Sequence, residues 1–110
     1  EWKAFRVPLD ASDRTGVSWE HFLTEVNSII VEATDNDDKQ MGCYFVRPRE
    51  GLNIDAADFQ SKVLFYLWQE VPKHRHSLLF VSVIQTFEDL FTLYSEGKQV
   101  FVDSIHRLHG

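Results

Sequence analysis

The sequence contains a single cysteine, Cys43, and no hydrophobic run long enough to cross a membrane. One cysteine excludes an internal disulfide bond and fits a reducing compartment. The opening residues, EWKAFRVPLD, lack the apolar core of a signal peptide. We therefore expect a cytoplasmic protein that makes no use of a membrane.

Positive charge is also scarce. Eleven lysines and arginines stand against 17 acidic residues, which gives a formal net charge of −6. A domain that binds nucleic acid mainly by neutralising phosphates needs the opposite balance. The acidic excess favours solubility and argues against direct DNA binding by this chain.

The motifs of common enzyme classes are missing as well. The chain has no GxxxxGK[ST] phosphate loop, GxGxxG, HExxH, GxSxG or CxxC. His74 and His76 are two residues apart, but Lys73 and Arg75 beside them would repel a cation. We predict no catalytic residue and no metal site, and we expect the histidine-containing stretch to be a solvated or partner-facing loop. A contact of this loop with nucleic acid or an acidic subunit surface is the alternative.

Apolar and aromatic residues are abundant. The 110 residues are 44% hydrophobic and include nine Phe, three Tyr and three Trp, enough for one domain with an aromatic core. The periodicities below predict a mainly α-helical fold, a small helical bundle with at most a short strand or hairpin. Residues 1–17 form an extended lead-in and 18–110 the helical part.

Three helices have clear start and stop signals. Ser18 is a suitable N-cap for the first, Asp55 for the second and Thr86 for the third. Pro72 ends the second helix and Gly97 the third. Each helix carries one apolar stripe, formed by Trp19, Phe22, Leu23, Val26, Ile29, Ile30 and Ala33; by Phe59, Val63, Tyr66 and Leu67 with Leu64 and Trp68; and by Phe87, Leu90, Phe91 and Tyr94.

Other segments are ambiguous. Residues 2–9 alternate loosely and fit an extended segment that Pro8 keeps at a sheet edge. Residues 77–84 fit either a strand or a buried helical turn, and residues 98–108 either a closing strand or a short helix. His21, His106 and His109 have no spaced companions and are expected at the surface.

The stretch DKQMGCYFV, residues 38–46, joins surface-type residues to apolar ones through Gly42. We expect Tyr44, Phe45 and Val46 to lie in the core, and Cys43 to be a small buried core residue rather than a nucleophile. Such a junction is either an ordinary loop or the edge of a ligand site, with polar groups and free backbone donors.

The order of two segments resembles a known family. DKQMGCYF follows the first helix, and DFQSKVLFYLWQEV (58–71) follows some fifteen residues later. This pair resembles the C-terminal lid of McrB-like AAA+ proteins, the NTPase subunits of methylcytosine-dependent, type IV-like restriction systems. EWKAFRVPLD resembles the stretch that follows the AAA+ core, and the likeness covers most of residues 1–95.

The resemblance implies a function. It makes the chain a lid cut from a longer NTPase, inactive alone because it lacks the phosphate loop, the acidic magnesium-binding motif and the core arginines. In the parent it would help bind GTP or ATP with Mg²⁺ and support a homo-oligomeric ring. Its partners would be its own AAA+ core, neighbouring subunits and an effector nuclease, with DNA bound only through other domains.

The resemblance also implies site residues. Lys39, Gln40 and Gly42 lie in the second-sensor region, and Arg47 is the arginine nearest to it. Lys39 would supply charge, Gln40 a donor and Gly42 close backbone approach. The opposing interpretation is that Gly42 simply turns the chain and Lys39 lies in solvent. A free-standing helical module that binds another protein is the alternative function, favoured if Trp2, Trp19 or Trp68 is exposed.

Overall fold

Helix α1 (Trp19–Thr34) is the longest element of the computed structural model, which describes residues 1–109. Ser18 caps it as predicted, because its hydroxyl accepts the His21 N–H at 3.3 Å. The helix ends at Asp35, which adopts a left-handed conformation with φ of 54°. The apolar stripe is buried along its length, except that Ile29 is half-buried.

The second predicted helix is one continuous rod in three parts: α2 (Ala56–Asp58), a π-helical segment (Phe59–Leu64) and α3 (Phe65–Glu70). Asp55 caps it by accepting the Asp58 N–H at 2.8 Å. The π-helical segment was not predicted; it turns Phe59, Gln60, Val63 and Leu64 together into the interior. The buried amide of Gln60 donates to Ser95 Oγ at 2.8 Å and so ties this helix to the next.

Helix α4 (Phe87–Ser95) begins with a capping box. The Thr86 hydroxyl accepts the Asp89 N–H, and the Asp89 carboxylate accepts the Thr86 N–H. Gly97 follows with φ of 76°, and a β-carbon there would lie 2.7 Å from Ser12 Oγ. Only glycine fits this position without strain.

The N-terminal lead-in is less extended than predicted. Residues Trp2–Ala4 form a 3₁₀ turn, η1, followed by the two-residue strand β1 (Arg6–Val7), which pairs antiparallel with β2 (Val17–Ser18). The Arg6 N–H also donates to the Leu52 carbonyl, and the Arg6 carbonyl accepts the Ile54 N–H. These bonds give β1 a second neighbouring segment. Val7 and Leu9 are fully buried, so this stretch belongs to the core.

The two ambiguous segments meet each other. Phe80 and Phe101 form a single antiparallel bridge, and residues 77–84 otherwise form neither a strand nor a long helix. Beyond the bridge the chain forms the short helix α5 (Asp103–His106) and a 3₁₀ turn, η5 (Arg107–His109). The two other 3₁₀ segments are η2 (Asp37–Lys39) and η4 (Lys73–Leu78).

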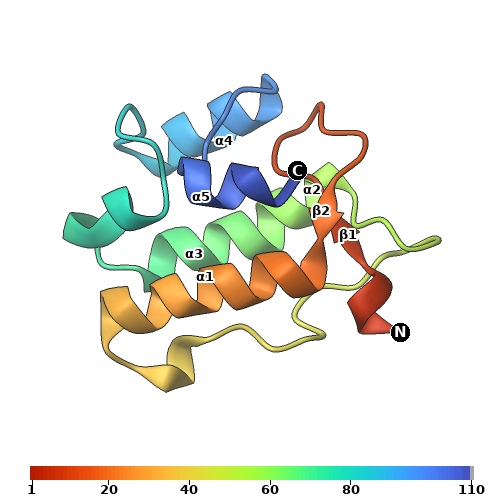
Figure 1. Cartoon of the computed structure of the whole chain (residues 1–110). Helices are drawn as coiled ribbons and strands as arrows, with labels where there is room; N and C mark the ends of the chain where they lie inside the picture. The colour runs from red at the N-terminus through yellow and green to blue at the C-terminus, as the bar shows by residue number, and fades with distance from the viewer. Residues whose placement is uncertain (110) are drawn as a thin grey trace.

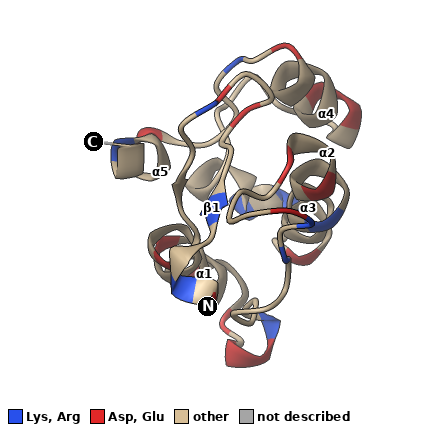
Figure 2. Ribbon diagram, turned by 90° about the vertical axis from the view of Figure 1, so that its right-hand side faces the viewer, with Lys and Arg blue, Asp and Glu red and all other residues tan. Residues whose placement is uncertain are grey.

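The helices surround an aromatic core. In Figure 1, α1 and α3 lie side by side, with α5 and then α4 above them in this view. The Phe22 ring is 5.5 Å from both Phe59 and Phe101, and Phe59 stacks on Tyr94 at 5.7 Å. Helices α1, α3, α4 and α5 carry acidic residues but no lysine or arginine, and the basic residues lie outside these four helices (Figure 2). The mainly α-helical fold with one short hairpin is therefore confirmed for the described chain.

Four positions differ from expectation. Tyr44 was predicted in the core but is 51% exposed, while Phe45 and Cys43 are half-buried. His76 was predicted in a solvated loop but is buried, with Nε2 donating to the Val71 carbonyl at 2.7 Å. The reason is that η4 folds back on α3 and packs the His76 ring against Trp68 in a tilted contact, at 4.1 Å between centroids.

The C-terminal histidines are also less free than expected. His109 Nε2 lies 2.8 Å from Asp13 Oδ2, and His106 is half-buried with Nε2 enclosed and unpartnered among the described residues. The Asp13 carboxylate also accepts the N–H groups of Leu9 and Gly16, both at 2.9 Å. Burial raises the pKa of Asp13, but these three bonds outweigh it and hold the pKa below its ordinary 3.8.

Removing the central ring should be costly. We expect Phe22→Ala to lower the free energy of unfolding by about 3–5 kcal/mol, because it leaves a cavity among the rings of Trp19, Phe59 and Phe101. Phe65→Ala, an aromatic truncation at a 48% exposed site, should cost far less. Urea unfolding of both variants measures the difference, and equal losses would contradict this description of the core.

Protonating Asp13 should destabilise the fold. Its folded-state pKa is lowered, so its contribution is present above the ordinary carboxyl pKa and is lost as pH falls through the lowered value. We expect Asp13→Asn to be less stable than the unmodified chain near neutral pH and to lose less stability between about pH 5 and about pH 2. Measuring the thermal unfolding midpoint of each variant as a function of pH tests this, with Asp37→Asn at an exposed site as the control. Parallel curves for Asp13→Asn and the unmodified chain would refute it.

Candidate functional site

Residues 39–47, here called the sensor segment, cross the face of α1 on the surface of the protein. Asn27 fixes the middle of the segment: its amide nitrogen donates to the Met41 carbonyl at 2.9 Å, and its amide oxygen accepts the Met41 N–H at 2.8 Å. Trp19 Nε1 donates to the Cys43 carbonyl at 2.7 Å. The side chains of Met41 and Val46 are buried beneath these bonds. The backbone of the segment is therefore held at fixed points on the helix.

Lys39 lies at the start of the segment and is paired. Its ammonium nitrogen is 2.8 Å from Glu70 Oε1 on α3, and its carbonyl accepts the Tyr66 hydroxyl at 2.7 Å. The hydrogen bond from Lys39 to Glu70, together with their charge attraction, raises the pKa of Lys39. Lys39 thus fastens the segment to α3, and its charge reaches a ligand only if it leaves Glu70.

Gln40 and Gly42 are exposed. A β-carbon built on Gly42 would meet no atom within 4 Å, and Gly42 is not among the glycines with positive φ. The fold itself gives no steric or conformational reason for glycine at position 42. This differs from Gly97, where the fold demands one.

Arg47 lies beyond the turn and is exposed. Its guanidinium carbon is 4.7 Å from the centre of the Tyr44 ring, a cation–π contact. Tyr44 in turn meets Phe5 edge to face at 6.3 Å. The Tyr44 ring therefore serves as a platform that holds the guanidinium at the surface, which explains why this tyrosine is outside the core.

The predicted site residues do not converge on one pocket. Lys39 is next to Glu70 and Tyr66 on α3, whereas Arg47 is next to Tyr44 and Phe5. Between them Gln40 and Gly42 face solvent. This strip presents an amide, a guanidinium and an unobstructed backbone to solvent. It cannot enclose a nucleotide by itself.

The sequence did not identify the residues that position the strip. Asn27 lies on α1 next to the buried Val26, and Glu70 and Tyr66 lie one turn apart on the rod. A carboxamide next to an apolar stripe is the signal that could have identified Asn27, because such a group needs hydrogen-bond partners. The partners of Glu70 and Tyr66 are 27–31 residues away and leave no local pattern.

Residues 1–109 contain neither a cluster of metal ligands nor a helix that could span a membrane. No group of three or more His, Cys, Asp or Glu side chains within residues 1–109 is placed to hold a metal ion. No helix in the same range has the length and apolarity to cross a bilayer.

Comparison with known proteins identifies none that is similar to this chain. Neither the models of protein families, nor the curated proteins, nor the solved structures yield a match to this chain. The assignment of a function therefore depends on the two sequence motifs and on the geometry of the strip.

Breaking the Asn27 clamp should loosen the segment. We expect Asn27→Ala to cost about 1–3 kcal/mol of unfolding free energy, since the Met41 N–H and carbonyl lose their partners. Amide exchange at Met41, whose N–H donates to Asn27, should accelerate more than exchange in α4. Ser28→Ala, an exposed change on the same helix, is the matched control. Unchanged protection at Met41 in Asn27→Ala would contradict the clamp.

Proposed function

We propose that this chain is the lid of an McrB-like AAA+ restriction NTPase and works as part of a longer protein. It would contribute to GTP or ATP binding and to ring assembly in anti-phage defence. The observation that carries the proposal is the sensor segment, which has the family-like sequence and is rigidly fixed while Gln40, Gly42 and Arg47 face outward. The small helical bundle fits a lid.

The chemistry suits an accessory role. Transfer of a phosphoryl group depends mostly on positioning and on stabilising negative charge. Arg47 can donate to phosphate oxygens through its guanidinium, and Gln40 can donate through its amide. Open space at Gly42 lets a ligand approach the backbone. When bound, Mg²⁺ would neutralise phosphate charge at ligands supplied by the AAA+ core.

Lys39 has a different part in this proposal. Because its ammonium group is paired with Glu70, it acts first by positioning Gln40 and Gly42. The partners proposed with this role are the AAA+ core of the same chain, neighbouring subunits of a homo-oligomeric ring and an effector nuclease. DNA would be bound through other domains, and the assembly would work in the cytoplasm.

Substitutions in the parent NTPase test the proposal. We expect Arg47→Ala to lower kcat/KM for the nucleotide by about 10- to 100-fold, the loss of one or two hydrogen bonds to a charged group. Gly42→Val should weaken nucleotide binding while leaving thermal stability nearly unchanged, because the fold has room for the side chain. Nucleotide titration and steady-state turnover give the two readouts.

An exposed arginine elsewhere is the control. Arg107→Ala on η5 should leave both readouts unchanged. If Gly42→Val and Arg47→Ala both bind and turn over nucleotide like the parent, the sensor segment has no contact with nucleotide and the proposal fails.

A protein-interaction module is the second candidate, and exposed aromatic residues favour it. The tryptophans do not: Trp19 is fully buried, and Trp2 and Trp68 are half-buried. Phe65 and Phe91, however, are 48% and 44% exposed on neighbouring helices. Unchanged nucleotide kinetics in the variants above would favour this candidate.

A further inference from the structure

Two adjoining hollows lie where η4 folds back against α3 and the start of α4. The larger, about 460 Å³, has Trp68, His76 and Phe87 among its lining residues; the smaller, about 310 Å³, includes His74 and Phe80. Lys73, His76 and Gln85 belong to both, so the hollows are neighbours. Both volumes are in the range that accepts a small ligand or a few side chains.

The floor of the hollows is aromatic and firmly built. The Trp68 ring lies 4.1 Å from His76 and 5.7 Å from Phe80 between centroids, and 6.4 Å from Phe87. His76 is itself fixed by the bond from Nε2 to the Val71 carbonyl. The site is therefore set by buried contacts rather than by loose surface side chains.

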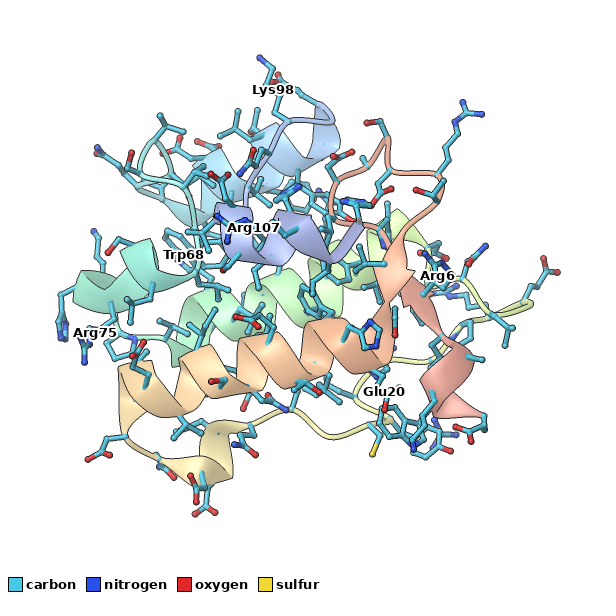
Figure 3. All side chains as sticks on the ribbon, viewed as in Figure 1. Arg6, Glu20, Trp68, Arg75, Lys98 and Arg107 are labelled. Carbon is cyan, nitrogen blue, oxygen red and sulfur yellow. The ribbon has the colours of Figure 1, made fainter. Side chains whose placement is uncertain are left out.

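The charge of the lining is one-sided. No residue that lines either hollow is acidic, although the chain carries 17 acidic residues against 11 basic ones. Lys73 and His74 stand at the edge, with hydroxyl and amide groups from Ser77, Gln85 and Thr86. Arg75 extends from the same turn at this end of the molecule (Figure 3). The lining side chains thus include the Lys73 ammonium group and no carboxylate, and the carboxylate of Asp89, which is outside the lining, is engaged by the N–H groups of Gln85 and Thr86.

Apolar surface continues outward from the larger hollow. Phe87 contacts Phe65 edge to face at 5.6 Å and Phe91 at 6.1 Å, and both of these rings are about half exposed. The hollows and this aromatic strip together form one surface, here called the aromatic groove. This surface is complementary to a partner with apolar side chains and flanking negative charge.

We propose that the aromatic groove binds an acidic segment of a partner protein, one in which Trp, Phe or Leu side chains alternate with Asp or Glu. The apolar side chains fill the larger hollow and cover Phe65 and Phe91, while the carboxylates face Lys73 and His74. A nucleic acid fits less well, because its continuous negative charge would also meet the acidic remainder of a chain with net charge −6. This site is separate from the sensor segment, and its test is independent of nucleotide.

Peptide selection on the isolated chain tests the proposal. A randomised peptide library displayed on phage is selected on the unmodified protein, and the enriched sequences are measured as fluorescein-labelled peptides. We expect an enriched pattern of Asp or Glu beside Trp, Phe or Leu. Affinity should fall about tenfold in Lys73→Glu, which replaces an attraction by a repulsion, and should weaken with salt.

Matched variants give the controls. Lys98→Glu makes the same charge change on an exposed lysine after α4 (Figure 3) and should leave affinity within about twofold. Phe65→Ser should weaken binding at an exposed site without unfolding the chain, which circular dichroism checks. No enrichment, enriched peptides without acids, or equal losses in Lys73→Glu and Lys98→Glu would overturn the proposal. So would binding of an oligo-dT strand that Lys73→Glu abolishes in place of peptide binding.

Discussion

Three phenylalanine rings from distant parts of the chain meet at the centre of the molecule, and their contact constrains everything around them. Phe22 on α1, Phe59 on the π-helical segment and Phe101 before α5 lie within 5.5–6.2 Å of one another. Edge-to-face contacts of this kind add about 0.5–1.5 kcal/mol per pair to the burial of the rings. Once the three rings are joined, α1, the 56–70 rod and the closing segment have fixed relative positions.

The sensor segment follows from that arrangement. The connection from α1 to the rod must run over the surface, since the interior is filled, and it is fastened by groups on the two helices it crosses. Asn27 and Trp19 on α1 and Tyr66 on α3 bond its backbone. Because these bonds hold the backbone, Gln40, Gly42 and Arg47 are not needed to keep the segment in place. A rigid segment with outward-facing polar groups suits a closing lid, because its conformational entropy is already lost before a ligand binds.

The sequence was informative where the cause of a structure is local. Ser18, Asp55 and Thr86 cap their helices because capping needs only neighbouring N–H groups. It failed where the packing of separate segments decides the outcome: Tyr44 lies at the surface between Arg47 and the distant Phe5, and His76 is buried because η4 folds back on α3. The π-helical segment likewise has no local signal, since residues 59–64 have an ordinary helical pattern. For the candidate site, the motif only predicts which residues take part, and the fold adds that Lys39 is paired and Gly42 is unconstrained.

The central claim is that this chain acts together with a nucleotide-binding core, and the coding sequence upstream of Glu1 tests it most directly. Sequencing the parent transcript should reveal a continuous reading frame that encodes a GxxxxGK[ST] phosphate loop before residue 1. A start codon immediately before Glu1, with no such loop in the same frame, would contradict the account.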